Sequence, residues 1–161
     1  MATIDYIRPN ERNGYINQEL ENTLYNSKNK EKVFRVLANY DKYDLKEIIN
    51  EVKKVDINVK DPYTNWTPLH YAAYIGNSSL ILSLLSMNSN PSIRDANKLS
   101  ALDIYVQNPK VEISTIIAFL CYGNEDSNEL AKQALEYAYE EKIKNFLKDF
   151  IKEGREKYCS D

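Results

Sequence analysis

Histidine, tryptophan and cysteine are scarce in this chain of 161 residues, which has one His, one Trp and two Cys. A zinc site needs clustered cysteine or histidine ligands, and the sequence has no such cluster. The two cysteines, Cys121 and Cys159, form neither a disulfide framework nor a metal-binding spacing, so we interpret them as free thiols. Free thiols fit a reducing compartment. The composition therefore predicts no metal site.

Glycine is also rare, with four residues, and the glycine-rich motifs that cradle phosphate groups do not occur. No stretch of about 20 apolar residues occurs, so we expect no membrane insertion. The segment 1–13 carries charges and no apolar run, so we expect no secretory signal peptide. The sequence predicts no cofactor and no catalytic residue.

A strongly basic segment is absent from a chain whose net charge is −3. Residues 27–60 carry nine basic and six acidic side chains, 61–124 carry three and four, and 125–161 carry seven and ten. None of these segments has the positive field that phosphate groups require. We therefore expect no nucleic-acid partner.

What the chain does contain is the motif Thr67-Pro68-Leu69-His70, followed after Tyr71 by two alanines. Threonine is suited to cap a helix and proline to occupy its first turn. Small alanines allow a second helix to approach closely. We interpret His70 as a hydrogen-bonding residue of this turn and not as a general base or a metal ligand.

The motif recurs in altered form at Ser100, and apolar residues at helical spacing follow both copies. The interval from Asp61 to Asp95 is one residue longer than the interval from Thr67 to Ser100, which predicts an insertion near residues 62–65. A second insertion is predicted around residues 108–110. Because Asp103 stands where the motif has histidine, we expect the second copy to keep some of the capping and to lose the rest.

The ankyrin repeat has a T-P-L-H-x-A motif and a period of about 33 residues. The motif at Thr67 and its copy at Ser100 resemble this pattern, because their separation equals that period. The resemblance implies an all-α fold, an ankyrin-repeat solenoid of stacked helix-turn-helix units with short hairpin loops and divergent terminal capping repeats. We expect a single domain over residues 1–161. Its predicted parts are an N-terminal segment or capping helix (1–30), a divergent repeat (31–60), a clear repeat (61–94), a degenerate repeat (95–127) and a C-terminal capping repeat (128–158).

In ankyrin proteins, partners contact the hairpin tips and the exposed face of the first helices. Transferred to this sequence, the predicted partner-binding residues are Tyr63, Trp66, Tyr71, Tyr74, Ile75, Arg94, Asn97, Leu99 and Gln107. Tyrosine and tryptophan supply large contact areas in binding sites. The alternative for Trp66 is packing against a neighbouring hairpin.

The resemblance implies a non-catalytic module that binds a partner protein, as an adaptor, an inhibitor or a host-directed effector. A second hypothesis is a homo-oligomeric scaffold that buries the same aromatic residues, although we favour a monomer. A third is an enzyme that uses His70 or Cys121, which we favour least. The implied location is the cytoplasm, including the cytosol of a host cell.

Overall fold

Helices are the regular structure of this protein, as a computed structural model shows for the residues that it describes, 26–123 and 126–159. Within these two ranges there is no strand. Residues 26–38 are helical. The elements that follow are η2 (Tyr40–Lys42), α2 (Leu45–Val52), α3 (Pro68–Ile75), α4 (Ser78–Ser86), α5 (Ala101–Tyr105), α6 (Ile113–Tyr122), α7 (Ser127–Tyr137), α8 (Glu141–Glu153) and η4 (Arg155–Lys157). The predicted all-α fold is confirmed.

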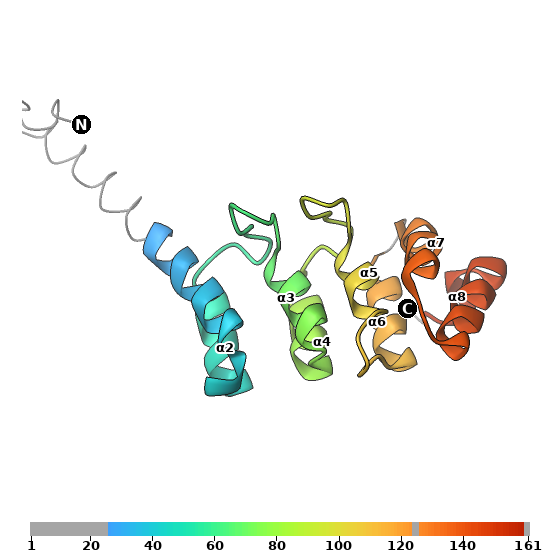
Figure 1. The fold of residues 1–161 in the computed structure, drawn as a ribbon, viewed down its shortest axis with the longest axis horizontal. Coiled ribbons are helices and arrows are strands. Elements are labelled where there is room, and N and C mark those ends of the chain that lie inside the picture. Colours follow the sequence, from blue (N-terminus) through green and yellow to red (C-terminus); the bar gives the residue numbers. More distant parts are fainter. Residues whose placement is uncertain (1–25, 124–125, 160–161) are drawn as a thin grey trace, which may run out of the picture.

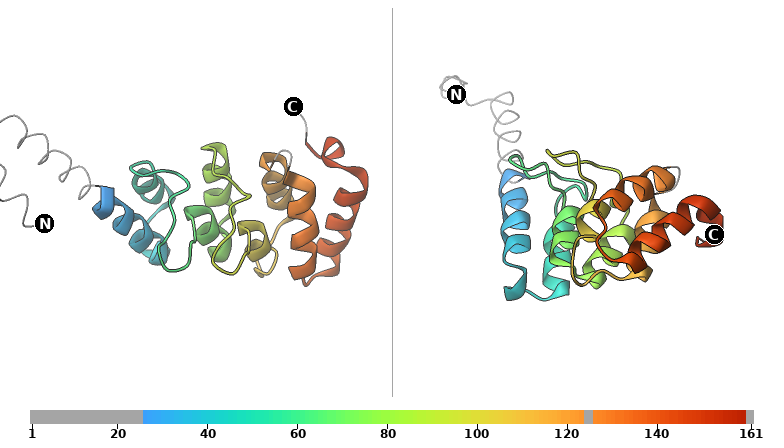
Figure 2. Two further views of the ribbon diagram at one scale, coloured as in Figure 1. Left: turned by 90° about the horizontal axis from the view of Figure 1, so that it is seen from above. Right: turned by 45° about the vertical axis from the view of Figure 1, so that its right-hand side comes forward.

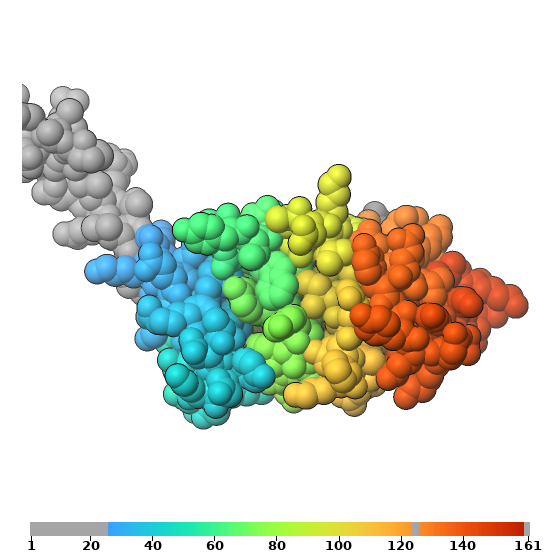
Figure 3. All heavy atoms as spheres, viewed as in Figure 1, coloured from blue at the N-terminus to red at the C-terminus, as the bar shows by residue number. Residues whose placement is uncertain are grey.

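The helices form two rows along the long axis of the molecule (Figure 1). Helices α3, α5 and α7 contact one another in sequence in one row, and α2, α4 and α6 do so in the other. Between the rows, α3 packs against α4, and α7 against α8. Figure 2 shows the helix pairs as successive layers, and Figure 3 shows that the layers follow one another without a gap. This is the architecture of a solenoid, in which each layer contacts its neighbours.

A continuous apolar core fills the space between the layers. The second helix of each pair supplies its bulk, and among the fully buried residues of α4 and α6 are Leu80, Ile81, Leu84, Leu85, Ile116, Phe119 and Leu120. Ala72 and Ala73 on α3 are also fully buried, which confirms close helix packing at the two alanines. Each buried leucine or isoleucine stabilises the fold by roughly 1.5–3 kcal/mol.

Capping side chains fix the start of three of the helices, α2, α3 and α5. Thr67 is the N-cap of α3, and its hydroxyl accepts the backbone N–H of His70. Asp44 caps α2 and Ser100 caps α5 in the same way. In all three helices the side chain three residues later, on Glu47, His70 or Asp103, accepts the backbone N–H of the cap. The reciprocal pair satisfies two backbone donors that a helix start would otherwise leave unbonded.

The loop before α3 is one residue longer than the loop before α5. The first is closed by a hydrogen bond from the Asp61 N–H to the Trp66 carbonyl (2.8 Å), and the second by one from the Asp95 N–H to the Leu99 carbonyl (2.9 Å). The insertion predicted near residues 62–65 is therefore confirmed. The two loops are joined by a bond from the Ala96 N–H to the carbonyl of residue 64 (2.9 Å).

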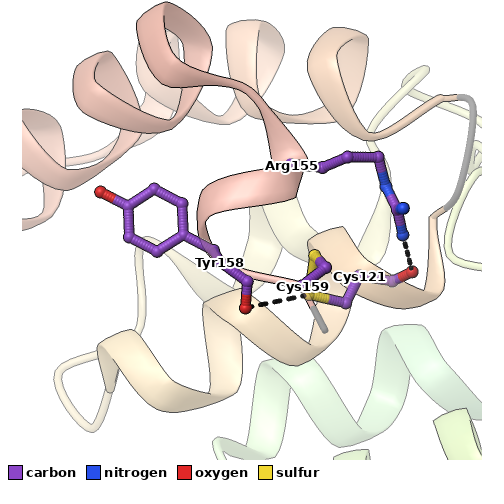
Figure 4. The surroundings of a disulfide bond; sticks show 4 residues. All are labelled: Cys121, Arg155, Tyr158 and Cys159. Carbon is purple, nitrogen blue, oxygen red and sulfur yellow. Dashed lines mark hydrogen bonds between the residues drawn. A yellow bond between two sulfur atoms is a disulfide. The ribbon is translucent and has the colours of Figure 1, made fainter. Parts of the chain in front are cut away.

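The C-terminal end is closed by a disulfide bond between Cys121 on α6 and Cys159, whose Cα atoms are 5.4 Å apart (Figure 4). Arg155 supports this junction by donating a hydrogen bond to the Cys121 carbonyl (2.9 Å). Our interpretation of the two cysteines as free thiols is therefore wrong. The sequence did not reveal the pairing because the two cysteines are 38 positions apart and meet only when η4 returns to α6.

Most of the N-terminal segment or capping helix predicted over residues 1–30 lies outside the described residues, which begin at residue 26. Helix 26–38 spans the boundary that we predicted between residues 30 and 31. It contributes Val33, Val36 and Leu37 to the core, each about 1% exposed. In the described part of the chain, no helix has the length and apolar character needed to cross a membrane.

Candidate protein-binding surface

A pocket of about 490 Å³ opens beside α3 and α5. Three of its wall residues are aromatic, and one of these comes from η2, in the preceding layer. We call it the aromatic pocket and define it by Tyr40, Trp66, Tyr74, Ile75, Ile104, Gln107, Asn108 and Pro109. Four of the nine predicted partner-binding residues therefore line one surface pocket, namely Trp66, Tyr74, Ile75 and Gln107.

Trp66 is half-buried in the wall of the aromatic pocket. Its indole N–H donates a hydrogen bond to Oδ2 of Asp95 in the next hairpin loop (2.9 Å). Its ring lies 5.5 Å from that of Tyr74 and stacks on that of His70 at 6.3 Å, measured between centroids. The alternative of packing against a neighbouring hairpin is thus confirmed, and the indole is also a wall residue of the pocket.

Tyr74 and Ile75 differ in exposure although they are neighbours on α3. The Tyr74 side chain is 66% exposed, which agrees with its predicted solvent-facing position. Ile75 is only 8% exposed, so its placement among solvent-facing residues is wrong. Ile75 therefore lines the aromatic pocket with only a small part of its side chain. The sequence did not reveal this because the burial of Ile75 depends on the next layer of the solenoid.

Asn108 lines the pocket and lies in the insertion predicted around residues 108–110. Its amide donates hydrogen bonds to the carbonyls of Tyr74 (2.8 Å) and Ala73 (3.4 Å) at the end of α3. It lies against Gly76, where a Cβ atom would come within 2.7 Å of the Asn108 amide. Gly76 also has a φ of +78°, which favours glycine. The predicted insertion at residues 108–110 was the signal for this contact.

A second pocket, of about 450 Å³, lies between the loop before α5 and α7. We call it the polar pocket, defined by Arg94, Asn97, Lys98, Glu129, Lys132, Gln133, Glu136 and Tyr137. It contains two of the predicted partner-binding residues, Arg94 and Asn97. The α7 residues of this pocket were not predicted, because their helix was interpreted only as part of the C-terminal capping repeat.

Asp103 is fully buried behind this pocket. Its carboxylate accepts the Ser100 N–H (2.8 Å) and the side-chain amide of Gln133, and the Arg94 guanidinium lies 3.8 Å away. Burial raises the pKa of Asp103 above its ordinary 3.8, while the hydrogen bonds and the charge of Arg94 act in the opposite direction. The expectation that the second copy keeps some of the capping and loses the rest is therefore confirmed: the Ser100–Asp103 pair keeps the capping box, but a carboxylate cannot donate to the next layer as Nε2 of His70 does, and Oδ1 of Asp103 has no partner among the described residues.

The other three predicted residues lie outside both pockets. Tyr63 is 92% exposed in the loop before α3. Tyr71 is half-buried between Phe34 and Trp66, and its hydroxyl donates to Asp61 (3.3 Å). Burial, together with the negative charge of Asp61, raises the pKa of Tyr71 above 10.

Leu99 is half-buried against the core, and its carbonyl accepts the hydrogen bond of His70 (3.0 Å). Both ring nitrogens of His70 have structural partners. Nδ1 accepts the Thr67 N–H (3.1 Å), so the proton is on Nε2, which donates to the carbonyl of Leu99 in the next layer. The interpretation of His70 as a hydrogen-bonding residue of the turn is confirmed.

Burial lowers the pKa of His70 below its ordinary 6.5, and the positive charge of Lys60 acts in the same direction. The ring is therefore neutral at pH 7. Among the residues 26–123 and 126–159, no group of three or more His, Cys, Asp or Glu side chains is placed to hold a metal ion.

Comparison with known proteins agrees with this geometry. Residues 27–85 match the family model described as ankyrin repeats in many copies. The chain is 37% identical over 60 residues to an ankyrin repeat protein of Fowlpox virus (strain NVSL), covering 37% of this chain and 9% of the viral protein. It is 30% identical over 71 residues to the ankyrin repeat and SAM domain-containing protein 6 of Rattus norvegicus, covering 43% of this chain and 8% of the rat protein.

No solved structure matches the chain significantly. The family match identifies residues 27–85 as ankyrin repeats, and the stacked helix pairs continue the same architecture beyond them. Ankyrin repeats generally mediate protein–protein interaction. The chain spans less than a tenth of the length of each relative, so the likeness concerns the repeats alone.

Proposed function

We propose that this chain is a non-catalytic protein-interaction module whose partner contacts the aromatic pocket and the hairpin tip at Tyr63, on the concave face of the solenoid. The observation that carries the proposal is the convergence of Trp66, Tyr74 and Tyr40 on one pocket. An exposed tyrosine beside a half-buried tryptophan offers large contact area at low entropic cost. The module would act as an adaptor, an inhibitor or a host-directed effector.

The residues of the polar pocket that we predicted, Arg94 and Asn97, extend the proposed surface towards α7. Arginine on such a rim adds orientation and association rate more than affinity. Tyr71 and Leu99 support the surface from behind, because their side chains pack against neighbouring layers. We therefore expect Tyr74 and Tyr63 to dominate the affinity.

The test begins with affinity purification of the partner from the native cell, followed by mass spectrometry and calorimetry with the purified partner. Tyr74→Ala removes a side chain that is 66% exposed, so the fold should remain intact. We expect at least a tenfold loss of affinity. The matched control is Tyr139→Ala, since Tyr139 is 70% exposed at the turn between α7 and α8. Equal affinities of the two variants for the partner would rule out this surface.

The alternative is a homo-oligomeric scaffold in which a second copy covers the aromatic pocket. The exposure of Tyr74 is the observation that favours it. Light scattering at a protein concentration of tens of micromolar separates the two proposals, because a monomer eliminates the scaffold.

A cytoplasmic location, including the cytosol of a host cell, stays a prediction from the resemblance. The similarity to a protein of a virus is compatible with it. The cysteine argument for a reducing compartment no longer supports it, because Cys121 and Cys159 are paired.

A further inference from the structure

We propose that the aromatic pocket receives a basic side chain of the partner protein, and that arginine is the best fit. This inference rests on the proposed function, because it specifies which side chain of the partner enters the surface described above. Four features of the pocket support it: its rings, the carboxylate behind Trp66, the neutral His70 and the amide of Gln107.

The aromatic rings form a site for a cation. Trp66 and Tyr74 are 5.5 Å apart between centroids and inclined at 51°, so their faces do not stack on each other. Tyr40 adds a third ring to the wall. A cation over the face of tryptophan or tyrosine is attracted by the negative charge of the ring face. The exposed Pro109 offers apolar surface for the aliphatic stem of a long basic side chain.

A carboxylate strengthens the attraction from behind the pocket. Oδ2 of Asp95 accepts the indole N–H of Trp66 (2.9 Å), which places a negative charge at the edge of that ring. Oδ1 is held by the backbone N–H groups of Asn97 (2.8 Å) and Leu99 (2.9 Å), so the carboxylate is fixed. Asp95 is 7% exposed. Charge in such a poorly hydrated position acts more strongly than charge in water.

No positive charge in the wall opposes a cation. None of the residues that define the pocket is Lys, Arg or His. His70 stacks on Trp66 at 6.3 Å and is neutral at pH 7, because burial lowers its pKa.

Gln107 supplies a hydrogen-bond acceptor for a basic group, and the aromatic faces favour arginine among such groups. Its side-chain amide N–H donates to the Asp103 carbonyl (3.0 Å). Its amide oxygen makes no hydrogen bond to the described residues and can accept one from an incoming guanidinium. Arginine also stacks its planar group on aromatic faces, whereas the lysine ammonium is a compact and strongly hydrated charge.

The first test uses the single tryptophan of the chain, whose indole N–H gives one resolved NMR signal. The full chain is titrated with the N-acetyl methylamides of arginine, lysine and norleucine at constant ionic strength. Norleucine has the linear apolar stem of lysine without its charge. We expect saturable shifts of the Trp66 signal, with arginine binding at least threefold more tightly than norleucine and lysine in between.

Norleucine binding as tightly as arginine would overturn the inference, as would the absence of a saturable shift with arginine. Neither result touches the proposed function, which is measured separately with the purified partner and the Tyr74→Ala variant. Conversely, tight arginine binding by the chain together with a partner insensitive to Tyr74→Ala would mean that the partner binds elsewhere.

The second test changes the ring without changing its shape. Because the chain has one tryptophan, biosynthetic incorporation of 5-fluorotryptophan or 5,6-difluorotryptophan alters Trp66 alone. Fluorine withdraws charge from the ring face, so the arginine affinity should fall stepwise with each fluorine while the norleucine affinity stays constant. An arginine affinity that fluorination leaves unchanged would contradict the proposal.

Discussion

The segments 61–94 and 95–127 make corresponding hydrogen bonds with different residues. In the first, Nε2 of His70 donates to the Leu99 carbonyl of the following loop. In the second, the carboxylate of Asp103 accepts from the Gln133 amide, which also donates to the Lys98 carbonyl (3.1 Å). The hydrogen-bond donor is thus His70 of the turn in the first segment, and Gln133 of the next helix, α7, in the second. Both segments thus make a side-chain hydrogen bond to the next layer, and histidine supplies it in only one of them.

The two segments also differ in how they are held to the rest of the chain. Helix α4 is held by packing and by an N-cap from Asn77, whose side chain accepts the Leu80 N–H (3.1 Å). Helix α6 has no side-chain cap at Glu112, and Cys121 in its last turn is covalently bound to Cys159. A cross-link therefore supports the segment whose motif departs further from the repeat pattern.

Reduction of the disulfide should give the largest effect. Closing a loop across 38 residues lowers the entropy of the unfolded chain, which corresponds to about 4 kcal/mol of stability. We expect a loss of up to this size in the free energy of unfolding, measured by urea denaturation with and without dithiothreitol. Hydrogen exchange should increase mainly in α6, α8 and η4, and much less in α3 and α4, because solenoid layers stabilise their neighbours first.

The Cys121→Ser, Cys159→Ser double variant is the control for reduction. It should match the reduced protein in stability and should not respond to dithiothreitol. If the wild type unfolds at the same urea concentration with and without the reductant, the cross-link does not stabilise this end of the molecule.

The fold was predictable because its determinants are local. Thr67 and Pro68 start a helix by themselves, and leucines at helical spacing define the buried face of α4 without reference to distant residues. The disulfide was not predictable from spacing, because Cys121 and Cys159 meet only through the packing of α8 and η4 on the preceding layer.

The candidate pocket was predictable only in part, for the same reason. Trp66, Tyr74 and Gln107 follow from their positions in the repeat. Tyr40 comes from a 3-10 helix in the preceding layer, and Asn108 from an insertion in the following one. Such contacts form where one layer stacks on the next. The repeat period of a sequence predicts the stacking, but it does not specify which side chains meet.

The two segments should differ in how their stability depends on pH. We expect this effect to be smaller than that of reducing the disulfide. The pKa of His70 is lowered in the folded state, so the unfolded chain binds more protons below its ordinary 6.5. Stability should therefore be full above pH 6.5 and should fall as the pH drops from 6.5 towards the folded pKa, by at most about 1.4 kcal/mol per pH unit. Urea denaturation at a series of pH values measures this slope.

Variants assign the slope to its residue. His70→Asn removes the titrating group and should flatten the profile between pH 7.5 and 5.5, even though its absolute stability is lower. Asp103 has the opposite sign: its raised pKa means that stability is lost as the pH rises from 3.8 through the folded pKa. Asp103→Asn should remove only that component. An unchanged slope below pH 6.5 in His70→Asn would show that another group titrates there.

The smallest effect concerns the loop backbone, where Asn65 and Lys98 occupy corresponding positions with φ of +59° and +67°. Asparagine tolerates this left-handed conformation, whereas lysine is strained there by about 1 kcal/mol or more. Lys98→Gly should relieve this strain, and it keeps the backbone carbonyl that accepts the hydrogen bond of Gln133. The greater conformational freedom of glycine in the unfolded chain offsets part of the gain in stability. We expect a net stabilisation of about 0.5 kcal/mol by urea denaturation and no gain for the matched Asn65→Gly variant, since asparagine has little strain to relieve. A loss of stability in Lys98→Gly would mean that the lysine side chain, through its place in the polar pocket, contributes more to the degenerate segment than the strain that it imposes.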